Sequence, residues 1–124
     1  MAARLPRSLK RSAGRTAAAG TPANIRVFGV TLDRDERAAI RERLGRKLGK
    51  HARSIERVTV RLRDVNGPRG GVDRVCTIKV VLSGLPSVVF ERTADTASAA
   101  FNLALAGAGR AVARSLQRRR QRRT

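Results

Sequence analysis

Residues 57–82 read RVTVRLRDVNGPRGGVDRVCTIKVVL, and this stretch decides the fold. Apolar side chains alternate with polar ones in residues 57–65 and again in residues 72–82, which is typical of strands buried on one face. The inward positions are Val58, Val60, Leu62, Cys76, Ile78, Val80 and Leu82, and the outward positions include Arg57, Thr59, Arg61, Arg63, Val75, Thr77, Lys79 and Val81. Asn66-Gly67 favours a tight turn, because both residues tolerate a positive φ. The stretch therefore predicts a long antiparallel hairpin.

Downstream of the hairpin, the pattern predicts one more strand and a long helix. SGLP (83–86) is typical of a turn, and SVVFERT (87–93) of a strand. Asp95 or Thr96 can cap the helix that follows. Its apolar face consists of Ala97, Phe101, Ala104, Leu105, Ala108, Val112, Ser115 and Leu116. Because most of these side chains are small, we expect the helix axis to lie close to the sheet.

Upstream of the hairpin, the pattern predicts a strand and an amphipathic helix. NIRVFGV (24–30) is typical of a strand. Asp33, with Glu36 three residues later, forms the capping-box pattern that marks a helix start. We expect this helix over residues 34–52. Its inward face would carry Arg37, Ile40, Leu44, Leu48 and His51.

The predicted element order is β-α-β-β-β-α, which indicates an α+β fold built as a two-layer sandwich. We expect one four-stranded sheet with two helices packed on one face, and a second face open to water or to a partner. Residues 24–117 would form this domain. We expect residues 1–23 to be a disordered basic arm, since their few apolar groups cannot offset the entropy of ordering them. Residues 118–124 would be a basic C-terminal tail.

The charge of the chain points to a polyanionic partner. Lys and Arg number 28 against 9 Asp and Glu, a formal net charge of +19 over 124 residues. A GC-rich genome explains part of the arginine and alanine excess but not the shortage of acids. A domain with this charge repels itself unless a polyanion is its usual partner. No apolar run approaches the roughly 20 residues of a membrane span, so we expect a soluble protein.

Two rows of cations stand out on the predicted helices. They are Arg43, Arg46, Lys50 and Arg53 on the first helix, and Arg110, Arg114 and Arg118 on the last. One such row is most simply a solvated helix face. Helical rows usually interleave acids, however, and here Glu42 is the only acid between Arg41 and Arg53, while none follows Asp95. We therefore expect both rows to bind phosphates, as one continuous strip.

Aromatic residues are scarce. The chain has no Tyr or Trp and three Phe, which we assign mostly to packing. This composition argues against a platform that stacks unpaired bases. It favours recognition of folded RNA by its shape and backbone.

The residues needed for an enzyme active site are largely missing from this sequence. Cys76 and His51 are the only residues of their kinds, which argues against a zinc site, and Cys76 has the spacing of a buried strand residue. The acids are scattered, with no Ser-His-Asp order. Asp64 and Asp73 flank the hairpin loop and could together hold Mg²⁺ in a small nuclease, although ion pairs with neighbouring arginines are the commoner use. We expect no catalysis, no cofactor, no metal and no small-molecule substrate.

The sequence resembles the ribosome hibernation promoting factor and ribosome-associated inhibitor family, formerly called sigma-factor modulation proteins. The resemblance covers about residues 24–120. It is carried by the element order and by RVTVRLRDVNGPRGGVDRVC (57–76), LGKHARSI (48–55) and GRAVARSL (109–116). The first of these is similar to the long hairpin of a bacterial subgroup of short members.

This resemblance implies a non-catalytic protein that binds small-subunit rRNA in the decoding channel, where mRNA and the tRNA anticodon arms would sit. Such a protein inhibits translation or promotes ribosome hibernation. Basic residues of the two helices make most contacts in the family. Carried over, these are Arg43, Arg46, Lys50, Arg53, Arg110, Arg114 and Arg118. We also expect a cytoplasmic protein that is a monomer off the ribosome and has no membrane partner.

The sequence departs from the family at several places. Ser98 stands where the last helix commonly opens with Tyr, and LGRKL (44–48) is one residue longer than the usual spacing. The second domain that long members use to pair ribosomes is missing, so we do not expect dimerisation of ribosomes by that route. Arg69, in the hairpin loop, has two open interpretations: an exposed side chain, or a contact with phosphate or another ribosomal surface.

Two other functions remain as alternatives. The first is a general RNA- or DNA-binding module without ribosome preference. The second is the small nuclease that would use Asp64 and Asp73.

Overall fold

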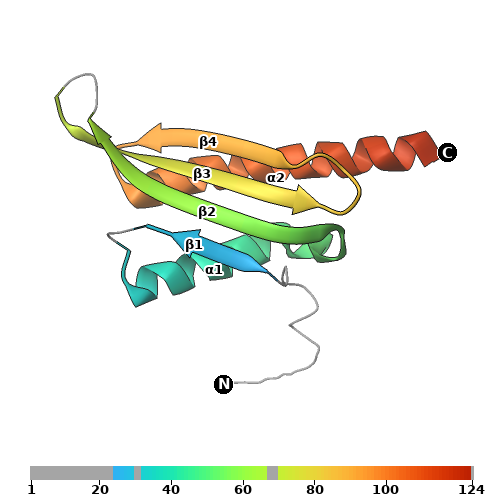
Figure 1. The fold of residues 1–124 in the computed structure, drawn as a ribbon, viewed down its shortest axis with the longest axis horizontal. Coiled ribbons are helices and arrows are strands. Elements are labelled where there is room, and N and C mark those ends of the chain that lie inside the picture. Colours follow the sequence, from blue (N-terminus) through green and yellow to red (C-terminus); the bar gives the residue numbers. More distant parts are fainter. Residues whose placement is uncertain (1–23, 30–31, 67–69, 124) are drawn as a thin grey trace.

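The computed structural model describes residues 24–29, 32–66 and 70–123 (Figure 1). The arm expected at residues 1–23 and the candidate site residue Arg69 lie outside the described residues. The elements follow the β-α-β-β-β-α order, so the predicted α+β fold is confirmed. They are β1 (Ile25–Phe28), α1 (Arg34–Leu48), the 3-10 helix η2 (Gly49–Ser54), β2 (Ile55–Asn66), β3 (Val72–Leu82), β4 (Val88–Ala94) and α2 (Ala97–Arg123).

The four strands form one mixed sheet in the order β1-β2-β3-β4. β1 runs parallel to β2, with α1 as the crossover between them, while β2, β3 and β4 form the predicted antiparallel meander. The β2–β3 hairpin is the longest pairing and extends from Ile55 opposite Leu82 to Asn66 opposite Val72. Gly84 has a φ of 71° in the β3–β4 turn, a conformation that favours glycine.

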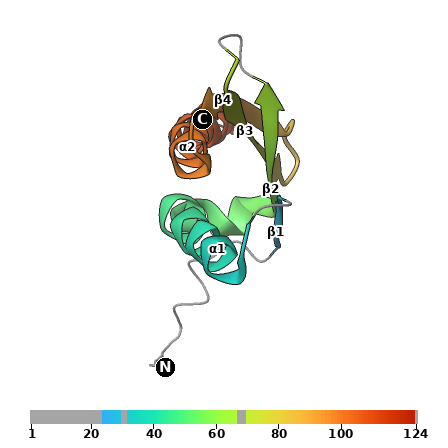
Figure 2. The same cartoon turned by 90° about the vertical axis from the view of Figure 1, so that its left-hand side faces the viewer.

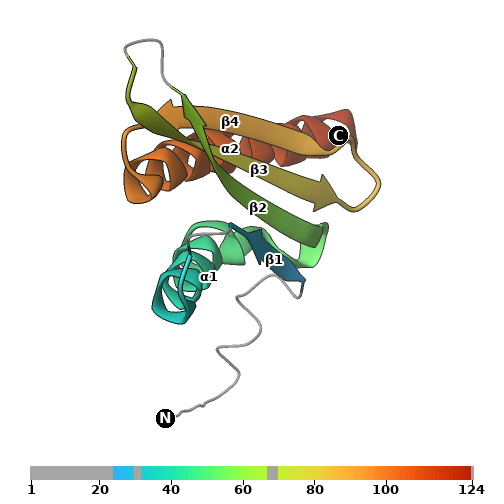
Figure 3. The ribbon, with the colours of Figure 1, turned by 60° about the vertical axis from the view of Figure 1, so that its left-hand side comes forward.

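Both helices lie on the same side of the sheet (Figure 2 and Figure 3). In the view of Figure 1, α1 lies behind β1, and α2 lies behind β3 and β4. All the predicted inward residues of β2 and β3 are at most 9% exposed. They form one cluster with Ile40, Leu44 and Leu48 of α1 and with the alanine-rich face of α2. Burial raises the pKa of the Cys76 thiol to about 12, so Cys76 is an apolar core group and not a nucleophile.

The predicted end of the first helix is wrong. The α-helical part ends at Leu48, not at residue 52, and the chain continues as η2 to Ser54. Gly45 and Gly49 weaken an α-helix by up to ~1 kcal/mol each relative to alanine, and a tighter 3-10 turn is common at such an end. The change matters for function because Lys50 and Arg53 lie on η2, where their directions differ from those on an α-helix.

α2 continues through residues 118–123, so the basic C-terminal segment is helical as far as Arg123. No helix in the described ranges combines the length and the hydropathy needed to cross a membrane. The helix carries Arg118, Arg119 and Arg120 at helical spacing beyond Leu116, the last buried residue of α2.

Val75 lies on the open face of the sheet, as its place in the alternation predicts, but it is buried. It is only 5% exposed and lies outside the core cluster. Its neighbours on the two adjacent strands are Arg63 and Thr93. Long side chains such as that of Arg63 cover apolar surface with their methylene groups, which accounts for a buried valine here.

Two arginines of α1 cover the outer edge of β1. Nη1 and Nη2 of Arg37 donate hydrogen bonds to the carbonyl oxygens of Val27 and Gly29, at 2.6 and 2.8 Å. Nη1 of Arg41 donates to the carbonyl oxygen of Ile25 at 2.8 Å. An uncovered edge would present these carbonyls to another strand. Arg37 and Arg41 therefore serve the fold.

α2 comes into close contact with β4 at Gly107. A Cβ atom added at Gly107 would lie 1.8 Å from Cε2 of Phe90 on β4, far inside contact distance. The same ring is in contact with the guanidinium of Arg92, whose Cζ is 4.2 Å from the ring centroid. The alanine-rich face of α2 predicted a close approach, and Gly107 is the residue that makes it possible.

Candidate nucleic-acid interface

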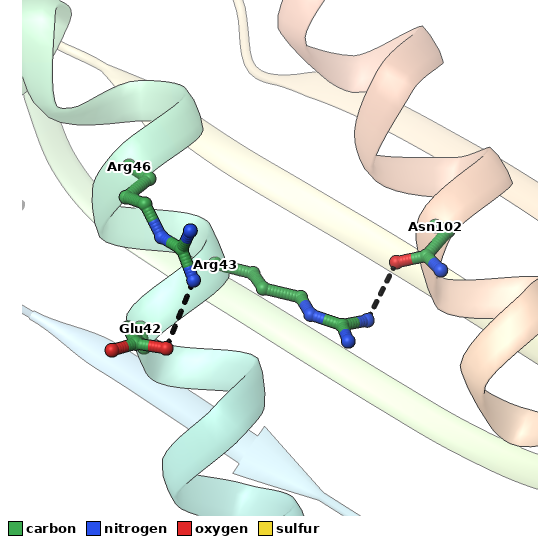
Figure 4. A network of polar contacts seen from close by, with 4 residues as sticks. All are labelled: Glu42, Arg43, Arg46 and Asn102. Atoms are coloured by element: carbon green, nitrogen blue, oxygen red, sulfur yellow. Dashed lines mark hydrogen bonds and ion pairs between the residues drawn. The ribbon is translucent and has the colours of Figure 1, made fainter.

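Arg43 crosses the boundary between the two helices. Its Nη1 donates a hydrogen bond of 2.9 Å to Oδ1 of Asn102 on α2 (Figure 4). The sequence predicted that this side chain binds an external phosphate, and in the structure it also links α1 to α2. The bond involves one of the five N–H donors of the guanidinium, so donors remain for an external acceptor.

Arg46 is paired with Glu42, the one acid between Arg41 and Arg53. Its Nη2 lies 3.0 Å from Oε1 of Glu42, one helical turn earlier (Figure 4). The two side chains are 73% and 70% exposed. Exposed pairs contribute ~0–1 kcal/mol, because water and salt screen the attraction. A phosphate can therefore replace the carboxylate of Glu42 with little loss of stability.

Lys47 lies on the same boundary, and the sequence pattern did not single it out. A Cβ atom added at Gly109 of α2 would meet the Lys47 side chain, with Cε at 2.9 Å and Cγ at 3.4 Å. The missing side chain at Gly109 thus gives the lysine stem a place beside α2. A shallow groove lined by Arg43, Arg46, Lys47 and Leu105 follows the boundary here.

The groove is followed, toward the C-terminal end of α2, by an open cleft of about 510 Å³. The cations that line it come from two elements: Lys50 and Arg53 from η2, and Arg119 and Arg120 from α2. Arg119 is held in place by a 2.9 Å hydrogen bond from its Nη1 to the carbonyl oxygen of Ser83. None of the described residues that line the cleft is acidic. The cleft is therefore a concave, positively charged surface with hydroxyl donors at Ser54 and Ser83.

His51 also lines this cleft. Its Nε2 is enclosed and has no hydrogen-bond partner in the part of the chain that the structure describes. Burial lowers the pKa of His51 below its usual value, and the nearby charges of Lys50 and Arg120 lower it further. Arg53 and Arg119 line the same cleft, so every charged group facing His51 there is a cation. His51 is thus neutral at pH 7.

The stability of the protein is expected to depend on pH through His51. The unfolded chain binds a proton near the ordinary histidine pKa, while the folded protein binds it only at lower pH, so acidification favours the unfolded chain. We expect the free energy of unfolding to fall between about pH 7.5 and about pH 5.5, above the range in which carboxylates titrate. Urea unfolding followed by circular dichroism measures this, and His51→Gln should flatten the dependence. An equally steep dependence in the variant would show that other groups cause it.

Arg110, Arg114 and Arg118 are exposed but lie away from this boundary. The residues of α2 that face α1 and η2 include Asn102, Leu105, Gly109, Leu116 and Arg120. Arg110 follows Gly109 by one residue and is turned about 100° from it, toward solvent. Arg114 and Arg118 come seven and eleven residues after Gly107, which returns them to the side of α2 that faces β4. Helical spacing thus places the three residues apart from the α1–α2 boundary, and RNA binding by them stays a prediction.

We name the cations along the α1–α2 boundary the helix seam. It consists of Arg43, Arg46, Lys47, Lys50, Arg53, Arg119 and Arg120. The four from α1 and η2 that the sequence selected are all present. The sequence pattern missed Lys47, Arg119 and Arg120. The place of Lys47 depends on the missing side chain at Gly109, and that of Arg119 and Arg120 on the direction of α2 relative to η2. Among the described residues, the one ion pair that a seam cation makes is Arg46–Glu42.

Asp64 and Asp73 do not form a carboxylate pair. Asp64 stands opposite Arg74 in the β2–β3 register, and its Oδ1 is 3.1 Å from Nε of Arg74. Asp73 stands opposite Val65, so its side chain points to the other face of the sheet. In the described ranges, no three His, Cys, Asp or Glu side chains come together as metal ligands. The geometry contradicts the Asp64–Asp73 nuclease site.

No protein-family model matches the sequence, and neither does any curated protein. The family resemblance is therefore carried by the quoted motifs and by the β-α-β-β-β-α order of the elements.

Proposed function

We propose that this protein binds rRNA of the small ribosomal subunit in the decoding channel and thereby inhibits translation or promotes ribosome hibernation. The observation that carries the proposal is the helix seam, a concave row of seven cations along the α1–α2 boundary. The resemblance to the ribosome hibernation family supplies the identity of the RNA. The role is non-catalytic, and the partner is the subunit itself.

The seam suits the backbone of a folded RNA. Its charges are carried by α1, by α2 and by η2, which directly continues α1. Because α1 and α2 share one core, we expect the charges to keep a fixed spacing when a ligand binds. Arg43 and Arg119 are oriented by hydrogen bonds to Asn102 and Ser83, which lowers the entropy lost on forming phosphate contacts. Most of the affinity would come from release of counterions, because the contacts are to phosphates. Binding should therefore weaken by about 10³-fold or more between 50 and 200 mM salt if six or more seam cations contact phosphates.

The alternative is a nucleic-acid-binding module without ribosome preference. The high charge of the whole chain favours it, since a net charge of +19 attracts any polyanion. The two functions differ in what competes for the protein. A factor that occupies the decoding channel must leave when mRNA and tRNA occupy it.

Sedimentation of the purified protein with ribosomal subunits tests the proposal. We expect the protein to move with small subunits in a sucrose gradient, to remain behind with large subunits, and to be displaced from small subunits by mRNA together with tRNA. Duplex DNA at equal phosphate concentration serves as the competitor control and should displace much less. If DNA displaces the protein as well as mRNA and tRNA do, or if both subunits bind it equally, the general module is the correct function.

A further inference from the structure

The face of the sheet that lies opposite the helices is a second positively charged surface. It is the face toward the viewer in Figure 1, where α2 passes behind the strands. A shallow depression of about 460 Å³ crosses it. The side chains that define its character are the cations Arg26, Arg57, Arg61 and Lys79 and the exposed apolar residues Phe28 and Val89. None of these belongs to the helix seam.

The strand register arranges these side chains, apart from Arg57, in two rows across the sheet. One row is Arg26, Thr59, Lys79 and Val89, and the other is Phe28, Arg61, Thr77 and Glu91. Adjacent members of a row are ~5 Å apart, because that is the spacing of neighbouring strands. Glu91 ends the second row at the β4 edge, where it accepts a hydrogen bond of 2.7 Å from the Thr77 hydroxyl and lies 3.8 Å from Nη2 of Arg63. Glu91 therefore already has partners within the protein, and it lies outside the depression. The described residues that line the depression are all basic, hydroxylic or apolar.

Phe28 is the aromatic residue of this face. It is 42% exposed, whereas Phe90 and Phe101 pack in or against the core, as expected for most of the phenylalanines. The guanidinium of Arg61, on the adjacent strand, stacks on its ring with Cζ 4.4 Å from the centroid. Planar groups of both kinds, aromatic rings and guanidinium planes, are the surfaces on which unpaired bases stack in single-stranded complexes.

We propose that this sheet face binds a single-stranded RNA segment. Arg26, Arg57 and Lys79 contact its phosphates, and a base stacks on the Arg61–Phe28 pair. A second copy of this chain would bring like charges together and is a poor occupant. An acidic peptide satisfies the cations but leaves the Arg61–Phe28 stack without a partner. The site uses no seam residue and lies on the other side of the sheet, so it does not depend on the function proposed above.

Fluorescence anisotropy with a labelled oligouridine of roughly ten nucleotides tests the site. The measurements use the Lys50→Glu/Arg120→Glu background, which disables the seam cleft as a competing site. Adding Arg57→Glu and Lys79→Glu should weaken binding by about tenfold or more, as expected for the loss of two phosphate contacts. The matched control adds Arg110→Glu and Arg114→Glu, which changes the net charge by the same amount on another surface, and should weaken binding much less. Equal weakening in the two variants would overturn the proposal.

A second oligomer separates the contribution of base stacking on Phe28 from that of phosphate contacts. An abasic ribose-phosphate oligomer of the same length offers the phosphates without bases. Phe28→Ala should weaken oligouridine binding by about fivefold or more while leaving the affinity for the abasic oligomer unchanged. Phe28→Leu, which keeps an apolar side chain at the position, should give the same pattern. The proposal is wrong if the variants weaken both probes equally or neither, or if duplex RNA or polyglutamate competes for this face as well as oligouridine.

Discussion

The Lys50→Glu/Arg120→Glu variant is expected to lose binding to the small ribosomal subunit by about a hundredfold or more, while its fold stays intact. Lys50 and Arg120 face the same cleft from η2 and α2, and both side chains are exposed. Each charge-assisted contact to a phosphate contributes ~1.5–3 kcal/mol, and a carboxylate in its place repels the phosphate. The measurement is the apparent Kd for small subunits at fixed salt, with thermal unfolding by circular dichroism as the check on folding.

The salt dependence of the same variant adds a second readout. Removing two phosphate contacts should reduce the slope of log affinity against log salt by about two. A loss of affinity without a change in slope would mean that the substitutions act through something other than phosphate contacts, such as the position of His51.

Arg110→Glu/Arg114→Glu is the matched control for this experiment. It changes the net charge by the same amount on the same molecule, but both residues lie on sides of α2 away from the seam. We expect a loss of affinity of less than about tenfold, from long-range electrostatics alone. If this variant loses as much as the seam variant, the outer arginines bind rRNA as the family resemblance implied, and the seam is not the interface.

The second large effect concerns stability. Gly107→Ala is expected to lower the free energy of unfolding by about 1–3 kcal/mol, although alanine is the better helix former by ~1 kcal/mol. The reason is the Cβ position 1.8 Å from Cε2 of Phe90, which forces the ring or α2 to move. Urea unfolding followed by far-ultraviolet circular dichroism measures the change, since the chain has no tryptophan to report it.

Gly109→Ala is the comparison that separates packing from helix propensity. Its Cβ would come nearest to Cε of Lys47, at 2.9 Å, and that atom is near the flexible end of an exposed side chain. We expect Gly109→Ala to be neutral or to stabilise the protein by up to ~1 kcal/mol. In addition, Phe90→Ala should remove most of the effect of Gly107→Ala, because the two residues share one contact. Equal stability of the two alanine variants would contradict the account of Gly107.

Features that depend on short-range patterns were predictable. The capping box is present, with the Asp33 backbone N–H donating to Glu36 at 3.0 Å and the Glu36 backbone N–H donating to Asp33 at 2.8 Å. The bounds of β3 match the predicted ones, and the predicted inward residues of β2 and β3 are buried. The helix boundary at Leu48 was missed, because α and 3-10 turns share a similar sequence preference, and the choice between them depends on where β2 must begin.

The candidate site was predictable only in part. Spacing along α1 and η2 selected Arg43, Arg46, Lys50 and Arg53, and all four line the seam. Spacing along α2 selected Arg110, Arg114 and Arg118, which helix geometry turns away from it. A helical row predicts which residues share a side of one helix, but not which side another helix will face. The alanine-rich face of α2 was correctly predicted to be buried. The sequence did not predict that Arg119 and Arg120 line the cleft, because this depends on which side of α2 faces η2.

The sequence by itself determined the element order, the inward faces of β2 and β3 and the excess of positive charge. The element order and the inward faces follow from alternation and helical spacing, which are patterns of a few neighbouring residues. The excess of positive charge follows from the composition of the whole chain. Only the tertiary structure decided which cations bind the protein's own backbone, as Arg37 does at the edge of β1, and which line the seam or the open sheet face. The reason is that arginine has the same side chain in each role, and the partner it meets is set by contacts between elements far apart in the chain.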